Sequence, residues 1–374
     1  MVVFGGTGDL AHRKLVPALY NLQINGQLPH AFALLGVGRR EKSSAEYRQE
    51  LAASVKEHSA PTWNEDLWPQ LAAKIYYQVG DLRDASSYPA LKEALETCSR
   101  EQGSGRNYLF YLAVAPHLFA SIAGNLSRNG MAAGDPGPDW RRIMIEKPFG
   151  YDLASARELN AALCAAFHED NIYRIDHYLG KEMMQNILVI RFANSVFEPL
   201  WNNRFIDHVQ ISAAESDGIG DRGRYYDRAG AMRDMVQSHL LQMLAISAME
   251  PPSENDPESI RLKKLELLNA IRLWPEESTP DKVVFGQYRG FQQEKDIAPN
   301  SETETYAAVK LAVNNDRWQG VPFYLRTGKK LQDKLLFYCD GEHDLMEISE
   351  KTGLGLYELH ETATLLYDNG YLEF

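Results

Sequence analysis

The sequence predicts an α/β protein that opens with a doubly wound Rossmann domain at residues 1–170. A smaller α+β domain at residues 171–334 and a small helical tail at residues 335–374 are predicted to follow. Two observations carry this prediction. In the first half, short apolar runs alternate with longer helical patterns, which is typical of βαβ units on a parallel sheet. After residue 170 the apolar runs group around one long helical pattern, which indicates a second core.

Five short apolar runs are predicted to form the buried strands of the first domain. They lie at residues 2–4, 31–37, 75–79, 107–113 and 142–145. Helical patterns at residues 15–22, 45–57 and 154–166 lie between these runs or follow them. Parallel strands that are covered on both faces read as continuous apolar runs, so helices are expected on both sides of the sheet.

The second domain is predicted to combine antiparallel strands with one long helix. The strands are expected at residues 209–214, 283–288 and 307–313, and the helix is expected at residues 231–249. Pro251, Pro252 and Pro257 place a loop after this helix, because proline cannot continue a helix and pushes the preceding residue towards extended geometry.

Composition argues against a membrane or nucleic-acid partner. Apolar residues make up 44% of the chain, yet no segment reaches the roughly 18 uninterrupted apolar residues of a membrane span. The sequence opens on a predicted strand rather than an export signal, so a cytoplasmic location is expected. The net charge is -12, whereas proteins that bind phosphate backbones present an excess of Lys and Arg. The tail alone, with nine acidic side chains and one lysine, holds -8 of this charge.

Cysteine usage predicts neither a disulfide framework nor a metal site. Cys98, Cys164 and Cys339 are odd in number and widely spaced, and no CxxC pair is present. A zinc site or a disulfide framework needs paired spacings that this chain lacks. We therefore expect three ordinary thiols and no metal.

A glycine turn after the first predicted strand is a candidate dinucleotide site. Residues 5–11 (GGTGDLA) lie between a strand and a helix, where backbone N–H groups and a helix N-terminus can hold a pyrophosphate. The second strand ends in Arg39 and Arg40 rather than in a carboxylate, which favours NADP over NAD because a guanidinium suits a 2'-phosphate. Lys14 is a further candidate. The alternatives are a purely structural tight turn and solvated surface charges.

Two polar groups in the second domain are candidates for substrate chemistry. In residues 173–182, a helix after Asp176 would place His177 and Lys181 on one face, where they could hold a phosphate dianion. The long helix carries His239 within an apolar run, and imidazole is the side chain that exchanges a proton most readily near neutral pH. A basic pair on an ordinary surface and a core histidine with a structural partner remain the alternatives.

Four stretches in family order resemble glucose-6-phosphate dehydrogenases. They are residues 4–11 (FGGTGDLA), 145–150 (IEKPFG), 174–182 (RIDHYLGKE) and 321–330 (VPFYLRTGKK). The resemblance covers residues 1 to about 334. It implies oxidation of glucose 6-phosphate at C1 to 6-phosphoglucono-δ-lactone, the first step of the pentose phosphate pathway, with hydride transfer to NADP and no metal. It also implies a homo-oligomer.

The resemblance assigns roles to individual residues. His239 would be the general base and Asp176 the carboxylate that orients it. The other implied residues are, for the substrate, His177, Tyr178, Lys181, Glu215, Asp234, Lys329 and Lys334, and, for the cofactor, Gly5, Thr7, Gly8, Asp9, Leu10, Lys14, Arg39, Asp81, Leu82 and Lys147. The Lys147–Pro148 peptide bond would be cis, as proline permits.

The sequence departs from this family at both ends. The first strand has only about three residues, which is expected to weaken the centre of the sheet, and residues 335–374 resemble a helix-turn-helix or winged helix rather than the family's closing sheet and dimer contact. The second domain is therefore a truncated substrate domain in this interpretation. A catalytically impaired relative that binds nucleotide or sugar phosphate, with the tail as an interaction module, is the alternative function. A glucose-fructose oxidoreductase relative would explain the first domain but not residues 176–182.

Overall fold

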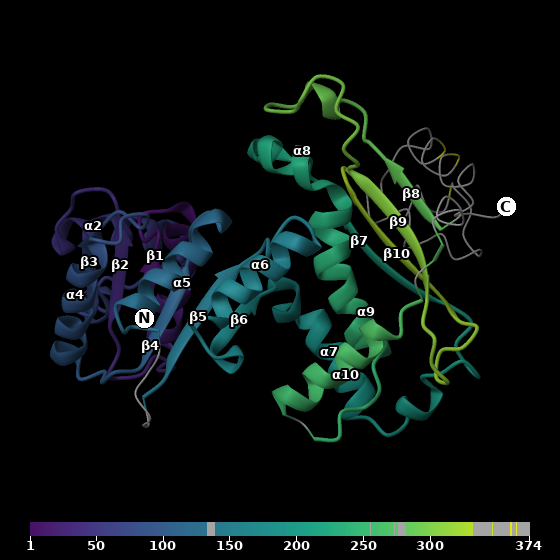
Figure 1. The fold of residues 1–374 in the computed structure, drawn as a ribbon, viewed down its shortest axis with the longest axis horizontal. Coiled ribbons are helices and arrows are strands. Elements are labelled where there is room, and N and C mark those ends of the chain that lie inside the picture. Colours follow the sequence, from purple (N-terminus) through teal and green to yellow (C-terminus); the bar gives the residue numbers. More distant parts are fainter. Residues whose placement is uncertain are drawn as a thin grey trace. The chain divides into compact units, whose positions relative to one another are not determined.

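The computed structural model describes residues 1–132, 139–254, 256–272, 274–275 and 282–331, with the single positions 346, 360 and 364. The chain divides into two compact units, Met1–Ile175 and Asp176–Phe374 (Figure 1). Apart from those three positions, the predicted tail lies outside the described residues. Among the described helices, none has the length and apolar character needed to cross a membrane.

Unit 1 is built on a six-stranded sheet in which all neighbouring strands are parallel. Its strands are β1 (Val2–Phe4), β2 (Leu34–Gly38), β3 (Ile75–Val79), β4 (Tyr108–Leu112), β5 (Arg141–Glu146) and β6 (Ile172–Ile175). Their order is β3-β2-β1-β4-β5-β6, the order of a Rossmann fold. The predicted fold class is confirmed, and the four-residue β6 is the one strand of this sheet for which no strand was predicted.

Helices cover both faces of this sheet because side chains alternate along each strand. Val2 and Phe4 of β1 face one core, and Val3 faces the other. The first core includes α4 (Ser87–Gln102), α5 (Phe119–Arg128) and α6 (Leu153–Cys164), and the second includes η1 (Ala11–Leu15), α1 (Val16–Ile24), α2 (Ser44–His58) and α3 (Trp68–Ala72). Although β1 is short, it is buried and pairs along its whole length with both β2 and β4.

Unit 2 contains a mixed sheet of four strands. They are β7 (Val209–Glu215), β8 (Val283–Gly286), β9 (Tyr306–Ala312) and β10 (Pro322–Lys329), in the order β7-β10-β9-β8. The predicted antiparallel arrangement is wrong for β7, which pairs in parallel with β10. The sequence analysis did not predict β10, because the polar residues Arg326, Thr327 and Lys329 hide its character, yet all three are buried.

The predicted long helix is present, but two types of helix make it up. It consists of the π-helix η8 (Met232–Leu240) followed by α9 (Leu241–Ala248), and it is preceded by α8 (Gly223–Ala231). The backbone of Gly230 is left-handed, with φ 65° and ψ 174°, and produces a kink before η8. This unit also contains the α-helices α7 (Glu182–Phe192) and α10 (Pro257–Asn269).

The loop predicted after this helix ends where α10 begins. Asp256 caps α10 by accepting from the amides of Glu258 and Ser259 at 2.9 and 3.1 Å. Pro257 then occupies the first helical turn, where its missing N–H leaves no intrahelical hydrogen bond unmade. Pro257 therefore starts a helix as well as closing the loop.

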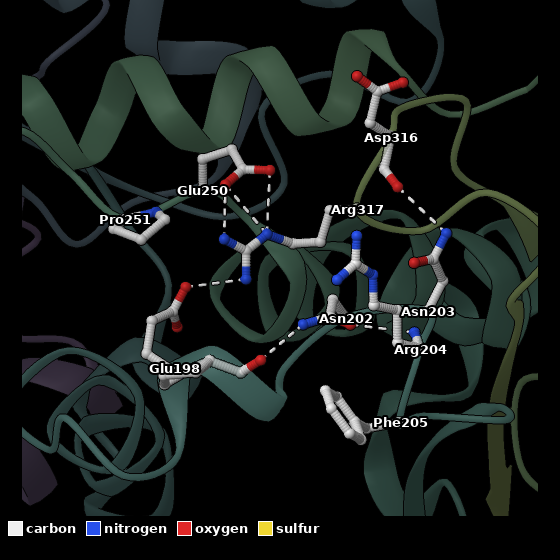
Figure 2. A pocket seen from close by; sticks show the side chains of 10 residues that line it. Glu198, Asn202, Asn203, Arg204, Phe205, Glu250, Pro251, Asp316 and Arg317 are labelled. Carbon is white, nitrogen blue, oxygen red and sulfur yellow. Dashed lines mark hydrogen bonds and ion pairs between the residues drawn. The ribbon is translucent and has the colours of Figure 1, made fainter.

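Arg317, in the turn between β9 and β10, ties three segments of unit 2 together around an open hollow (Figure 2). Its guanidinium donates to both carboxylate oxygens of Glu250 at 2.7–3.0 Å, pairs with Glu198 at 2.8 Å and donates to the carbonyl of Trp201 at 2.8 Å. The fully buried Arg191 also pairs with Glu198, at 3.4 Å. Since Arg317 joins Glu198, Trp201 and Glu250 here, we interpret this hollow as a structural junction.

Arg317→Met should lower the free energy of unfolding by roughly 2–4 kcal/mol, because it leaves two carboxylates without their shared donor. Urea denaturation followed by tryptophan fluorescence would measure the change. Arg204→Met is the matched control, since Arg204 lies exposed in the same hollow. Equal stability losses in the two variants would contradict the structural role of Arg317.

Candidate functional site

Asp176 and His239 form a buried, hydrogen-bonded pair in unit 2. Asp176 directly follows β6 and caps the 3-10 turn η5 (His177–Gly180), and His239 lies in η8. Nδ1 of His239 donates to Oδ1 of Asp176 over 2.6 Å, and the two side chains are 1% and 10% exposed respectively. Because Nδ1 carries the proton in this bond, Nε2 is the ring atom that can accept one.

Opposing effects act on the Asp176 carboxyl. Burial raises its pKa, whereas the hydrogen bond from His239, the charge of that ring and the amide of Tyr178 lower it, and the net pKa lies below the ordinary aspartate value. Asp176 is therefore a carboxylate at neutral pH. A carboxylate in this position holds the ring in one orientation and stabilises the charge that the ring gains with a second proton.

The residues after Asp176 gather around the His239 ring. The Tyr178 ring stacks on it with centroids 4.1 Å apart, and the His177 ring meets it edge-on at 4.8 Å. The Lys181 ammonium lies 3.5 Å from the centroid of the Tyr178 ring. The structure thus brings the candidate phosphate-binding residues and the candidate base into one cluster.

The helix that would place His177 and Lys181 on one face does not form. The chain makes a single 3-10 turn that ends at Gly180, Lys181 is extended with ψ 138°, and α7 begins at Glu182. The i,i+4 spacing therefore does not place the two cations on one helix face. Both side chains contact Tyr178 instead. The Lys181 ammonium lies over the Tyr178 ring, and the His177 ring meets the Tyr178 ring edge-on.

A second polar cluster contains three of the other predicted substrate residues. Glu215 ends β7 and Lys329 ends β10, and their side chains form an ion pair because the two residues are register partners in the sheet. Asp234 is buried in η8 and accepts from the Tyr225 hydroxyl at 3.2 Å. Burial and the charge of Asp234 both raise the pKa of Tyr225, so it remains a neutral donor.

The π-helix geometry affects how Asp234 and His239 are presented. They lie five positions apart in the sequence, which would place them about 140° apart around an ordinary α-helix. The i→i+5 hydrogen bonds of a π-helix bring residues at this spacing closer to one face. π-Helical turns are rare and occur often at functional sites, and the nine-residue π-helix η8 carries both residues.

Lys264 is a charged neighbour that the sequence analysis missed. It lies on α10 at helical spacing between Ile260 and Leu268, which pack on the core of unit 2. Burial lowers the pKa of Lys264, whereas the charge of Asp176 raises it. A lysine in the middle of an apolar helix stripe is the signal that could have identified it.

Asp176, His177 and His239 could also serve as metal ligands. Their donor atoms lie within 4.8 Å of one another, and two imidazoles with one carboxylate are a common ligand set for divalent transition metals. Here, however, Oδ1 of Asp176 and Nδ1 of His239 are engaged with each other.

The remaining predicted substrate residue, Lys334, lies outside the described residues.

In unit 1 the glycine turn is shaped by close contacts. Gly5 has φ 82°, and a Cβ there would lie 2.3 Å from the carbonyl oxygen of Ala113. A Cβ at Gly6 would lie 2.8 Å from the Cα of Gly36, and the Gly8 amide donates to the carbonyl of Gly5 at 2.8 Å. The helix that follows begins at Asp9 and Leu10, whose amides have no acceptor within the helix. This cradle fits a pyrophosphate.

Arg39 lies beside this turn. It is exposed directly after β2, and a Cβ at the preceding Gly38 would lie 3.2 Å from the Thr7 hydroxyl. The parallel sheet brings the carboxyl ends of β1 and β2, and with them the glycine turn and Arg39, to one edge. Lys14 is exposed in η1.

Asp81 and Leu82 follow β3 at the same edge of the sheet. Both line a narrow hollow together with Val37 and Tyr88. Lys147 directly follows β5, and its bond to Pro148 is cis, as the resemblance implied.

Comparisons with known proteins point to one family. Residues 2–186 match the model described as glucose-6-phosphate dehydrogenase, NAD binding domain, and residues 188–336 match the model of its C-terminal domain. The glucose-6-phosphate 1-dehydrogenase of Bacillus subtilis strain 168 is 45% identical over 344 residues, covering 89% of this chain and 69% of that protein. That of Chlamydia pneumoniae is 40% identical over 384 residues, covering 100% of this chain and 73% of that protein.

Solved structures show the same likeness. A glucose-6-phosphate 1-dehydrogenase from Mycobacterium avium gives a TM-score of 0.77 at 38% identity, covering 88% of this chain and 69% of that one. A glucose-6-phosphate dehydrogenase in complex with its substrate glucose-6-phosphate gives 0.79 at 33% identity, covering 88% and 68%. The chain spans about two thirds of the length of such relatives. The family model ends at residue 336, whereas the alignment with the Chlamydia pneumoniae protein includes the tail.

The Asp176 carboxylate should contribute stability that depends on pH. Since its folded-state pKa is depressed, the contribution is present above the unfolded-state pKa and is lost as pH falls through the folded-state pKa. Asp176→Asn should therefore be less stable than the unmodified protein at pH 7, by about 1–3 kcal/mol. The difference should shrink below about pH 4. Urea unfolding of both proteins across this range tests it, and a constant difference would contradict the argument.

Proposed function

Because this chain belongs to the glucose-6-phosphate dehydrogenase family, we propose that it oxidises D-glucose 6-phosphate at C1 to 6-phosphoglucono-δ-lactone and passes hydride to NADP. The observation that carries the proposal is the buried Asp176–His239 pair, with Tyr178 stacked on the imidazole and Lys181 over Tyr178. This reaction is the first step of the pentose phosphate pathway.

His239 acts as the general base in this proposal. Its Nε2 takes the proton of the C1 hydroxyl as the C1 hydrogen leaves with its electron pair, and the sugar becomes the lactone. Asp176 stabilises the imidazolium that forms. NADP, when bound, supplies the nicotinamide that accepts the hydride. The retained Asp176–His239 pair supports this function over that of a catalytically impaired binding protein.

The surrounding groups bind and orient the substrate. The imidazole of His177, the hydroxyl of Tyr178 and the ammonium of Lys181 are donors that suit a phosphate dianion. Hydrogen bonds in which one partner is charged are stronger than those between neutral groups. The carboxylates of Glu215 and Asp234 are acceptors for sugar hydroxyls. Lys329 neutralises Glu215, and Lys334 completes this proposed set.

The cofactor is proposed to bind along the carboxyl edge of the unit 1 sheet. Gly5, Thr7, Gly8, Asp9 and Leu10 form the pyrophosphate turn, with Arg39 at the 2'-phosphate. The remaining members of this set are Lys14, Asp81, Leu82 and Lys147.

We further propose that the protein acts in the cytoplasm, without a nucleic-acid or membrane partner, as a homo-oligomer. The family resemblance supports the oligomer, and sedimentation of the purified chain would test it. The primary test of function is whether purified protein raises the absorbance of reduced nicotinamide when given glucose 6-phosphate and NADP.

His239→Ala should lower kcat by roughly two to four orders of magnitude and leave the KM for glucose 6-phosphate largely unchanged, because it removes a general base rather than a binding group. Steady-state kinetics measure both constants. His208→Ala is the matched control, since His208 also pairs with an aspartate, Asp207 at 3.0 Å, but on the surface. A large rise in KM at unchanged kcat would reassign His239 to binding.

Arg39→Ala should weaken NADP binding by roughly 10- to 100-fold and change NAD binding little, because only NADP carries the 2'-phosphate. Titration calorimetry with each nucleotide measures the two affinities. Arg100→Ala, at an exposed arginine in the last turn of α4, is the control. Equal loss of NADP and NAD affinity in Arg39→Ala would show that this side chain does not contact the 2'-phosphate.

A further inference from the structure

The start of the helix that carries His239 is held by a residue from a distant loop. Glu304 lies just before β9, and its Oε1 accepts from the amide of Met232 at 2.9 Å. The carbonyl of the same residue accepts from the amide of Ala231 at 2.9 Å. These amides lie at the N-terminal end of η8, where the helix itself supplies no acceptor and a negative charge is favoured by the helix dipole.

Gly230 makes this contact possible. It adopts φ 65°, which favours glycine, and a Cβ at this position would lie 2.3 Å from Oε1 and 2.5 Å from Oε2 of Glu304. No real Cβ approaches an atom so closely. The kink between α8 and η8 is thus the place where the carboxylate enters, and any other residue at Gly230 would displace it.

The loop that carries Glu304 is fixed to the sheet by its neighbour. The amide of Thr305 donates to the carbonyl of Gly286 at 2.8 Å, and its carbonyl accepts from the amide of Lys329 at 2.9 Å. Its hydroxyl accepts from the amide of Tyr288 at 2.8 Å. Thr305 is fully buried. Glu304 therefore holds the start of η8, and the next residue, Thr305, holds the end of β10.

We propose that Glu304 is a positioning residue, which sets the π-helix η8 relative to the end of β10 and so places His239 and Asp234 against Lys329. The inference rests on the proposed function, since these three side chains must meet one hexose phosphate. Glu304 acts through the helix backbone and contacts no reacting atom. A shift of the helix start by about 1 Å would move the base relative to the substrate, and misplacement of this size costs on the order of 100-fold in rate.

The test compares substitutions of Glu304 with a matched substitution in the same loop. Glu304→Ala should lower kcat by roughly 10- to 100-fold and leave the KM for NADP unchanged, because the proposed cofactor residues all lie in unit 1. Glu304→Gln keeps an acceptor oxygen for the Met232 amide and should restore kcat to within about threefold of the unmodified protein. Glu304→Asp, one methylene shorter, should fall between them. Glu302→Ala, exposed two residues earlier, should behave as the unmodified protein.

Hydrogen exchange gives a second readout that needs no activity. The amides of residues 231–240 should exchange faster in Glu304→Ala than in Glu302→Ala, because the start of η8 has lost its acceptor. An Ala variant with unmodified kcat and exchange would overturn the proposal, as would a Gln variant no better than Ala. If the unmodified protein does not oxidise glucose 6-phosphate, the proposed function fails, and exchange alone then decides whether Glu304 holds the helix.

Discussion

The hydrogen bond between His239 and Asp176 is the interaction on which the candidate site depends. It joins a side chain in a π-helix to the carboxylate that caps a single 3-10 turn, 63 residues earlier in the chain. Burial makes this bond necessary, because a carboxylate removed from water needs a hydrogen-bond partner. The same bond holds the imidazole in one orientation. The stacked Tyr178 ring and the ammonium of Lys181 then form the rest of the cluster.

Backbone placement, rather than unusual side chains, distinguishes both candidate sites. In unit 1 the glycines allow the turn to lie against β2 and β4, so that helix amides and Arg39 share one edge of the sheet. In unit 2 the left-handed Gly230 lets a distant carboxylate reach the start of η8. Close backbone approach is a use that glycine serves better than any other residue. Each site thus depends on contacts that involve no reacting group.

Buried polar groups in unit 2 form connected networks. Arg317 and Arg191 share Glu198, and Lys329 pairs with Glu215 across neighbouring strands. Removing one partner of such a pair leaves the buried cation without its counter-charge, so these pairs favour a single arrangement. In the central strand β10, Lys329 pairs with Glu215, Arg326 donates to the Gln210 side chain and Thr327 donates to the carbonyl of Ala213. These partners let the strand bury three polar side chains, and the polar sequence for that reason gave no strand signal.

The sequence by itself determined the Rossmann sheet, most of its strands and the chemistry of the glycine turn, since these follow from local apolar runs and short spacings. Resemblance to the family supplied the roles assigned to Asp176 and His239. Only the tertiary structure decided that η8 is a π-helix, that β10 lies between β7 and β9, and that the Lys181 ammonium lies over the Tyr178 ring. It also revealed Lys264 and Glu304, because residues far apart in the chain meet through packing, which no local pattern records.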